Sequence, residues 1–355
     1  MHVSLLAATD PFDGTAGAER TLSRWLTHLS ENGYTVDVLS YGTEPDERVD
    51  GCTVMRFDDK CPVSTIEQYC ATTGVDVVCT TGGWGDLALW AADRHDIPSL
   101  LCVTSDFDLR LTSGIAVDTP PTRAVAVSHD YRNRAEAVYN CPVRTVYPPI
   151  DFEYYTVGQV EREAYTMVNP IEFKGGGLFG ELSKRHSDEA FLAIMGWFHQ
   201  RTDDCSFDMD MYDIFSRTIN EYVSPPEEPD LNGIPNLEYL VDADIRDVYR
   251  RTKVLLVPSQ WNEAFGRVVL EAMHNGIPVI ASDVGGLPEA CGGAAMLVEE
   301  YNSLDAWSSR MDELADEDVY DRYVEKGLER ATQYREQQPR EVEKFEAELV
   351  ATMDK

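Results

Sequence analysis

Lysine is scarce in this chain, and basic side chains as a whole are few. Of its 355 residues 7 are lysine, and Lys plus Arg number 30 against 63 Asp plus Glu, which gives a net charge of −33. Binding to nucleic acid and to anionic lipid both require a basic surface, so we expect neither as the main interaction. Dispersed acid with little lysine is typical of proteins kept at high salt, where screening suppresses self-repulsion. The composition therefore predicts a cytoplasmic protein from a halophilic organism.

Long apolar runs are also missing. No stretch of 18 apolar residues exists, so no membrane-spanning helix is expected, and peripheral association with a membrane stays open. The N-terminus lacks a basic segment and reaches Asp10-Pro11 early, which argues against a signal peptide.

Residue patterns that hold metal ions are absent as well. The 8 cysteines include no C-x-x-C pair and no His/Cys cluster, so they are predicted to be reduced core residues. Four aspartates crowd one loop but lack the central glycine of a calcium loop, so no metal is expected there. They are Asp203, Asp204, Asp208 and Asp210.

A length of 355 residues suits two domains of roughly 150 to 180 residues each. Short apolar runs alternate with helical patterns, beginning with a strand at 2–8 and a helix at 18–32. Such alternation favours α/β domains built on parallel sheets. The stiff run Pro148-Pro149-Ile150-Asp151 suits a boundary, so we expect one Rossmann-like domain over 1–155 and a second over 156–335.

The clearest unit of this kind runs from Val254 to Glu289. It reads as a strand over 254–257, a loop, a helix that begins near Ala264, a second strand over 278–282 and a tight turn at Gly285-Gly286. Five residues of the helix have the spacing of a core-facing stripe. They are Phe265, Val268, Val269, Ala272 and Met273.

Two glutamates in this unit suit a sugar or a nucleotide. Glu263 stands in the loop, and Glu271 stands at the edge of the apolar stripe, roughly 10 Å along the helix axis. Carboxylates accept hydrogen bonds, and the vicinal diols of a ribose or sugar ring are natural partners. The amides of Phe265 and Gly266 at the helix N-terminus attract phosphate. One short segment thus offers diol acceptors and an anion site, which together suit a nucleotide-sugar.

A purely structural interpretation explains the same residues. Arg267 and Glu271 are spaced i, i+4 and could form a surface ion pair worth a few tenths of a kcal/mol. Glu263 could be only an acidic residue at a helix start. Spacing alone does not separate the two interpretations.

Two further loops carry groups that suit a diphosphate. A strand over 165–168 runs into a turn where Lys174 precedes Gly175, which puts a point charge beside helix amides. Because lysine is so rare here, its presence at this turn favours a functional role over a generic surface charge. Gly17, at the start of the helix over 18–32, offers amides to an anion, although a tight turn would need the same glycine.

Several motifs stand in order along the unit from 254 to 289. They are Glu263, Phe265-Gly266, Glu271-Ala272-Met273, Gly276-Ile277-Pro278-Val279 and Gly285-Gly286 through Glu289. Together they resemble the C-terminal signature of family 4 glycosyltransferases, which are retaining enzymes of GT-B fold that use nucleotide-sugars. The resemblance implies that Glu263 contacts the donor sugar and that Glu271 holds the nucleotide ribose.

The resemblance extends to the other loops. Ala16-Gly17-Ala18-Glu19-Arg20 is similar to the Gly-Gly-Ala-Glu-Arg run of that family, which implies that Gly17 lies at the donor–acceptor junction. Lys174 matches the family lysine on the donor diphosphate, and Asn169 stands at about the place of its arginine. Many members carry a histidine where this chain has Ser105-Asp106. Either Asp106 or Ser105 takes that place or the acceptor site has been rebuilt; alternatively, Asp106 simply caps a helix or turn.

The resemblance implies an α/β protein of GT-B fold, with two Rossmann-like doubly wound domains facing across a cleft. Residues 336–355 would form a helix that packs back on the N-terminal domain, and Phe345, Leu349 and Met353 are spaced by four to do so. The chain would transfer a sugar, with retention, from a nucleotide-diphospho-sugar to a sugar or lipid-linked acceptor, with no further cofactor and no metal. The alternatives are an epimerase or hydrolase of the same fold, which would turn over the donor alone, and a non-catalytic nucleotide-sugar binder.

Overall fold

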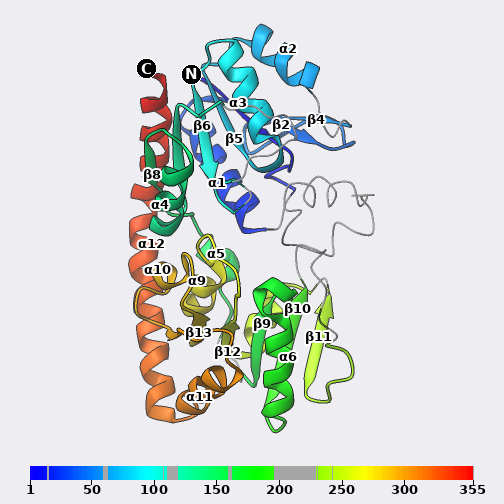
Figure 1. Ribbon diagram of the computed structural model, residues 1–355, viewed down its shortest axis with the longest axis vertical. Helices are drawn as coiled ribbons and strands as arrows, with labels where there is room; N and C mark the ends of the chain where they lie inside the picture. The colour runs from blue at the N-terminus through cyan, green and yellow to red at the C-terminus, as the bar shows by residue number, and fades with distance from the viewer. Residues whose placement is uncertain are drawn as a thin grey trace. The chain divides into compact units, whose positions relative to one another are not determined.

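The chain forms two compact units, whose elements are labelled in Figure 1. The first comprises Met1–Pro149 and Gln338–Lys355, and the second comprises Ile150–Gln337. The computed structural model describes residues 1–13, 16–58, 63–106, 108–109, 119–158, 162–195, 229, 231–241 and 243–354. The four aspartates that the sequence predicts to form a metal-free loop lie outside the described residues.

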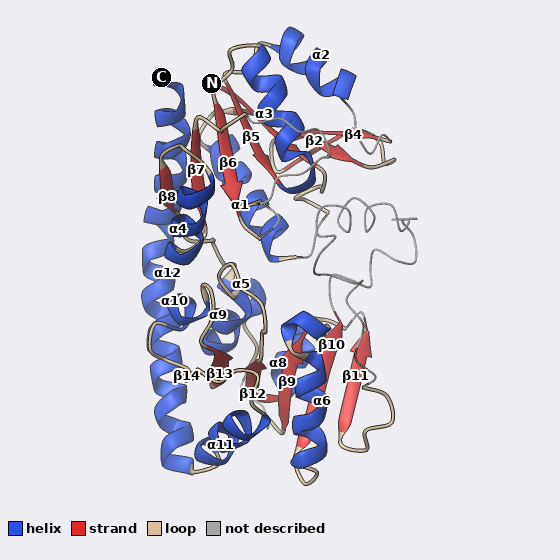
Figure 2. Cartoon of the chain, in the orientation of Figure 1, coloured by secondary structure: helices blue, strands red, loops and turns tan. Residues whose placement is uncertain are grey.

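An eight-stranded sheet forms the centre of the first unit (Figure 2). Its order is β3-β4-β2-β1-β5-β6-β7-β8, and each neighbouring pair is parallel except β3 with β4. The strands are β1 (His2–Ala7), β2 (Thr35–Tyr41), β3 (Glu47–Val49), β4 (Cys52–Phe57), β5 (Val77–Thr81), β6 (Ser99–Val103), β7 (Arg123–Ala126) and β8 (Val143–Thr145). β5 and β6 are buried at every residue, as expected for parallel strands covered on both faces. The pair β3–β4 was not predicted, because β3 is too short and too polar to show a pattern.

Helices cover this sheet. They are α1 (Gly17–Glu31), α2 (Val63–Thr73), the short η1 (Gly82–Trp84), α3 (Gly85–Arg94) and α4 (His129–Val138). α2 and α3 pack against each other (Figure 1) and share a buried cluster with the sheet that includes Ile66, Cys70 and Leu87.

The last part of α12 (Glu317–Met353) belongs to the first unit. Phe345 stacks on Trp25 of α1 with ring centroids 4.5 Å apart, and Leu349 is fully buried. Met353 is 41% exposed, so the predicted apolar stripe is wrong at its last position, where the helix ends.

A six-stranded parallel sheet forms the centre of the second unit. Its strands are β9 (Ala164–Val168), β10 (Ala190–Met195), β11 (Leu237–Val241), β12 (Thr252–Val257), β13 (Val279–Ser282) and β14 (Met296–Val298). The order β11-β10-β9-β12-β13-β14 means that the sheet grows in one direction from β9 and then in the other from β12. In sheets of this kind, ligands bind at the carboxyl ends of the strands where the order reverses.

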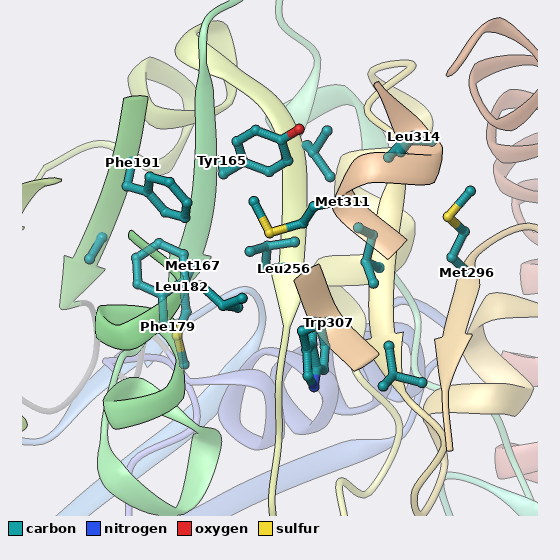
Figure 3. Packing of buried hydrophobic residues seen from close by; sticks show 14 of the residues in the cluster. Tyr165, Met167, Phe179, Leu182, Phe191, Leu256, Met296, Trp307, Met311 and Leu314 are labelled. Atoms are coloured by element: carbon teal, nitrogen blue, oxygen red, sulfur yellow. The ribbon is translucent and has the colours of Figure 1, made fainter. Parts of the chain in front are cut away.

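Helices also flank this second sheet. They are α5 (Phe152–Tyr155), the short η2 (Glu172–Lys174), α6 (Gly176–Arg185), α8 (Ile245–Arg251), α9 (Arg267–His274), α10 (Leu287–Cys291), α11 (Leu304–Leu314) and the first part of α12. Figure 3 shows the main core, in which Tyr165 and Phe191 of the sheet share one cluster with Phe179 of α6 and with Trp307 and Met311 of α11.

α9 begins later than the sequence predicts. The prediction started the helix near Ala264, but its first residue is Arg267. Gly266 precedes it with φ of +91°, a left-handed conformation that a right-handed helix excludes, so the residues before it stay in a loop. The predicted core stripe is also partly wrong. Val268 is only half-buried and Leu270 is fully buried, because α5 and α10 contact the helix in addition to the sheet.

No helix in the described part of the chain is long and apolar enough to cross a membrane. The six described cysteines are free, and five of them are buried, as the sequence predicts for core residues. Burial raises the pKa of the Cys79 and Cys291 thiols to about 12, which keeps both in the unreactive protonated form at neutral pH.

Candidate functional site

Three loops leave the carboxyl ends of β9, β12 and β13. The strand order of the second sheet reverses between β9 and β12, and β13 lies beside β12. The loops cover residues 169–175, 258–266 and 283–286. Parallel neighbours end at the same edge of a sheet, so all three loops start from one edge. Each of them carries residues that the sequence marks as candidates.

Glycines allow these loops to interlock. A Cβ on Gly175 would come closer than 3.0 Å to the carbonyl group of Pro258, and a Cβ on Gly286 would meet the carbonyl group of Ala264 in the same way. No other residue type fits at either position without moving the backbone. The Gly286 N–H also donates to the Glu263 carbonyl oxygen at 2.7 Å. The loop that carries Glu263 is therefore held by backbone contacts from both of its neighbours.

Lys174 and Glu263 lie close together at the point where the strand order of the second sheet reverses, between β9 and β12. Nζ of Lys174 lies 3.0 Å from Oε1 of Glu263, and the Ser259 hydroxyl donates to the same oxygen at 2.7 Å. The two charged side chains are 20% and 12% exposed, so the pair is mostly shielded from water. Burial raises the pKa of Glu263, but the charge of Lys174, with the hydrogen bonds that Glu263 accepts, outweighs burial and holds this pKa below its usual value. Glu263 is therefore a carboxylate at neutral pH.

Glu263 stands in a loop and not at a helix start, since α9 begins only at Arg267. Glu263 is therefore not an acidic residue at a helix start. Lys174 comes from η2, a different part of the chain, so the fold brings together two residues that the sequence proposed separately. An ammonium group has three N–H donors, and a contact with one carboxylate oxygen leaves it able to bind a second anion.

Glu271 lies inside the second unit and is 4% exposed. Tyr249 of α8 donates to its Oε2 at 2.8 Å, and Nε of Arg267 lies 3.9 Å from its Oε1. The Arg267 and Glu271 side chains are 9% and 6% exposed, so the i, i+4 pair exists but is not the surface ion pair of the structural interpretation. Sequence reasoning missed Tyr249, because a tyrosine in a short helix 22 residues before its partner leaves no pattern.

The predicted anion site at the start of α9 needs a correction. Phe265 is 3% exposed, and its ring lies 5.7 Å from the ring of Tyr334. Because the helix begins at Arg267 with Gly266 as its N-cap, Phe265 precedes the helix. The amides at this helix end are therefore those from Gly266 onward.

Asn169 shapes the turn that presents Lys174. It follows β9 with φ of +55°, a left-handed conformation that asparagine tolerates better than most residues. Its N–H donates to the Ile194 carbonyl oxygen at 2.8 Å, and its own carbonyl oxygen accepts from the Ile171 N–H at 2.8 Å. These contacts lead the chain from the sheet edge into η2.

The candidates in the first unit follow β1 and β6. Gly17 is exposed and is the first residue of α1. The Asp106 side chain contacts two residues of α4. Its Oδ1 accepts hydrogen bonds from the Tyr131 hydroxyl and from Nη1 of Arg134, both at 3.0 Å. The Ser105 hydroxyl donates to Asp108 at 3.1 Å.

Asp108 is a buried acid that sequence reasoning missed. It is fully buried and joins the ends of β5 and β6. It accepts from the backbone N–H groups of Gly82 at 2.6 Å, Thr104 at 2.6 Å and Ser105 at 2.7 Å, and from the Thr81 hydroxyl at 2.7 Å. Burial raises the pKa of Asp108, and these hydrogen bonds oppose that rise. An acid flanked by apolar residues just after a buried strand is the signal that could have found it.

In the described ranges, no group of three or more His, Cys, Asp and Glu side chains is placed to hold a metal ion. The second unit gathers one lysine, carboxylates and helix amides at one sheet edge instead, which is chemistry for an anion that also carries hydroxyl groups.

Part of the chain is similar to a known protein family. Residues 234–331 match the family model described as "Glycosyl transferases group 1". The chain is 31% identical over 169 residues to Alpha-1,3/1,6-mannosyltransferase alg-2 of Neurospora crassa, which covers 43% of this chain and 35% of that protein. It is 36% identical over 99 residues to O-antigen chain mannosyltransferase B of Escherichia coli, which covers 28% of this chain and 26% of that protein. The alignments thus span less than half the length of these curated relatives.

Solved structures resemble the chain over nearly its whole length. Sucrose-phosphate synthase from Thermosynechococcus elongatus matches with a TM-score of 0.74 and 17% identity over 99% of each chain. HepE from Anabaena, solved in complex with UDP and glucose, matches with a TM-score of 0.73 and 13% identity over 99% of this chain and 100% of that one. These neighbours are GT-B proteins, and with the two parallel-sheet units they confirm the GT-B fold class predicted from the sequence.

Proposed function

We propose that this chain is a glycosyltransferase that moves a sugar from a nucleotide-diphospho-sugar to an acceptor hydroxyl. The family match over residues 234–331 and the transferase names of the aligned relatives support the reaction class. The observation that carries the proposal is the Lys174–Glu263 contact of 3.0 Å at the reversal of the second sheet. It joins a cation for a diphosphate to a carboxylate for sugar hydroxyls at the place where this type of sheet binds ligands.

In the proposed reaction Lys174 neutralises the diphosphate as it leaves. Charge builds up on the leaving group in the transition state, so a fixed cation there contributes directly to the rate. Glu263 accepts hydrogen bonds from the donor sugar, and Glu271 accepts them from the ribose. The amides from Gly266 onward add positive ends of peptide dipoles near the diphosphate. Asn169 lies at about the position of the family arginine and shapes the turn, but it carries no charge.

The acceptor side of the proposal rests on Gly17 and Asp106 of the first unit. Asp106 is held by Tyr131 and Arg134, which fixes its orientation, and Gly17 permits close approach to the start of α1. Retention of configuration, a sugar or lipid-linked acceptor, the absence of a metal requirement and a cytoplasmic location are also part of the proposal. They follow from the resemblance to family 4 enzymes and from the acidic composition.

The test is turnover of UDP-, GDP- and ADP-sugars at high salt, read as release of the nucleoside diphosphate with and without sugar acceptors. Wild type should release it, and release should rise with a suitable acceptor. Lys174→Met should lower the rate roughly 100-fold, the size of effect typical for one group that stabilises transition-state charge. Lys184→Met is the matched control, because Lys184 lies on the exposed side of α6 in an ion pair with Glu181.

The outcomes separate the competing functions. Release of nucleoside diphosphate that no acceptor accelerates would indicate a hydrolase, and isomerisation of the donor without release of the diphosphate would indicate an epimerase. Thermal stabilisation by a nucleotide-sugar without turnover would indicate a binding protein. Equal rates for wild type and Lys174→Met would refute the proposed role of the pair.

A further inference from the structure

The phenol of Tyr249 contacts Glu271 in the interior of the second unit. Its hydroxyl donates to Oε2 of Glu271 at 2.8 Å, and both residues are almost without exposure to solvent, 0% and 4%. Tyr249 lies on α8, just before β12, whereas Glu271 lies on α9, just after the loop that follows β12. The hydrogen bond therefore ties together the two helices that bracket the strand carrying the candidate site.

The hydrogen bond from Tyr249 sets the orientation of the Glu271 carboxylate. The last side-chain torsion of glutamate has a broad, roughly two-fold profile, so nothing intrinsic locks the plane of the two oxygens. Tyr249 occupies one lone pair of Oε2, and Arg267 stands 3.9 Å from Oε1, too far for a direct hydrogen bond. Tyr249 is thus the closer and better-placed of these two partners.

Tyr249 itself is fully buried and remains a donor. Its ring packs edge-on against Tyr155, with centroids 6.5 Å apart and an interplanar angle of 63°. Burial, together with the negative charge of Glu271, raises the pKa of Tyr249 well above its usual value. The phenol therefore keeps its proton over the whole working range of pH and always presents O–H to the carboxylate.

We propose that Tyr249 is a positioning residue for the nucleotide, whose hydroxyl orients the Glu271 carboxylate toward the ribose hydroxyls. The inference rests on the proposed function, in which Glu271 binds the ribose. It goes beyond that function by assigning to Tyr249 the discrimination between a ribonucleotide and one that lacks ribose hydroxyls. A carboxylate whose plane is fixed by one hydrogen bond presents its oxygens in a fixed direction, and a vicinal diol needs such a fixed direction to make two hydrogen bonds.

The test measures the affinity of uridine, guanosine and adenosine diphosphates and of their 2′,3′-dideoxy forms by calorimetric titration. For the base that binds best, the quantity compared between variants is the ratio of the affinity for the nucleoside diphosphate to the affinity for its dideoxy form. Tyr249→Phe removes only the hydroxyl, and it should lower this ratio by about tenfold, the lower end of what a hydrogen bond to a charged group supplies. Partial unfolding would weaken both ligands equally and would leave the ratio unchanged.

Two further variants complete the experiment. Tyr320→Phe is the matched control, because the Tyr320 hydroxyl donates to the Lys253 carbonyl oxygen at 2.9 Å, in the same unit but without contact to Glu271. Its ratio should equal that of wild type. Glu271→Gln should lower the ratio at least as far as Tyr249→Phe does.

The results separate the proposed role of Tyr249 from the proposed binding of the ribose by Glu271. A lowered ratio in both Glu271→Gln and Tyr249→Phe supports the inference. A lowered ratio in Glu271→Gln with an unchanged ratio in Tyr249→Phe overturns the role of Tyr249 and leaves the proposed function standing. An unchanged ratio in Glu271→Gln overturns the ribose assignment of Glu271 and the inference with it.

Discussion

Replacing Lys174 by methionine should destabilise the second unit even in the absence of any ligand. The substitution keeps the aliphatic stem and removes only the charge, which leaves the Glu263 carboxylate buried without its cation. Wild type holds the two charged groups 3.0 Å apart with side-chain exposures of 20% and 12%. The Ser259 hydroxyl would still donate to Glu263, but a neutral donor offsets only part of the lost attraction.

The magnitude follows from the burial of the pair. Removing one partner of a buried ion pair costs about 3–5 kcal/mol. We take about 3 kcal/mol, because the pair retains some exposure and Glu263 keeps the Ser259 hydrogen bond. For a cooperative unit of 150–250 residues this corresponds to a fall in Tm of about 6–12 °C.

The effect should also depend on pH. In wild type the pKa of Glu263 is depressed, so the pair contributes stability above the unfolded-state pKa of about 4.3, and this contribution is lost as the pH falls through the folded-state value. In Lys174→Met burial dominates and should raise that pKa, so the carboxylate destabilises the fold at neutral pH and protonation relieves it. The gap in stability between the two proteins should therefore be largest at pH 7 and should narrow toward pH 4.

The assay is thermal unfolding followed by circular dichroism at fixed high salt between pH 7 and pH 4. Adding Glu263→Gln to Lys174→Met should recover most of the lost stability at pH 7, because it removes the uncompensated charge. Lys184→Met, which breaks an exposed pair, should stay within about 0.5 kcal/mol of wild type. A cost below about 1 kcal/mol at pH 7, or a gap that does not change with pH, would refute this reasoning.

Three further predictions concern the loops and the charge of the chain. Asp108→Asn should cost about 2–3 kcal/mol in chemical denaturation, because the amide NH₂ faces backbone N–H groups in either orientation; a cost below about 0.5 kcal/mol would contradict the hydrogen-bond assignment. Gly175→Ala should cost about 2–5 kcal/mol, since its Cβ would strike Pro258 and its φ of +87° is left-handed. Gly233→Ala, with a similar φ of +77° but open space around it, should cost only about 1 kcal/mol, and equal costs would rule out the clash. The Tm should fall when salt is lowered from molar to millimolar concentration, because the acidic side chains behind the net charge of −33 then repel one another without screening. A Tm independent of salt would exclude a halophilic adaptation.

Much of the second unit could be predicted because most of its strands are buried on both faces. β9, β12 and β13 read as short apolar runs in the sequence, and parallel strands in such a unit end at one edge. The pairing of β9 with β12, which brings the loops with Lys174 and Glu263 to neighbouring strand ends, was not predicted. The 3.0 Å contact between them is the specific result that only the structure supplies.

The rest depends on contacts that leave no periodic signal. Gly266 is left-handed, which delays the start of α9, and a Cβ at this position would meet the Leu287 side chain. A glycine in the sequence reveals neither its φ nor its neighbours. Tyr249 meets Glu271 across 22 residues, and Asp108 collects hydrogen bonds from two different strand ends. Buried polar contacts of this kind are set by tertiary packing, so residue spacing and propensity do not predict them.

The proposed function stands on a diphosphate bound by Lys174. Calorimetric titration of nucleoside diphosphates, and of the same nucleosides without phosphate, into wild type and Lys174→Met tests it most directly. The proposed site predicts that wild type binds the diphosphate more tightly than the nucleoside. In Lys174→Met the affinity for the diphosphate should fall at least about tenfold, and the affinity for the nucleoside should stay the same. Equal diphosphate affinity in the two proteins would contradict it.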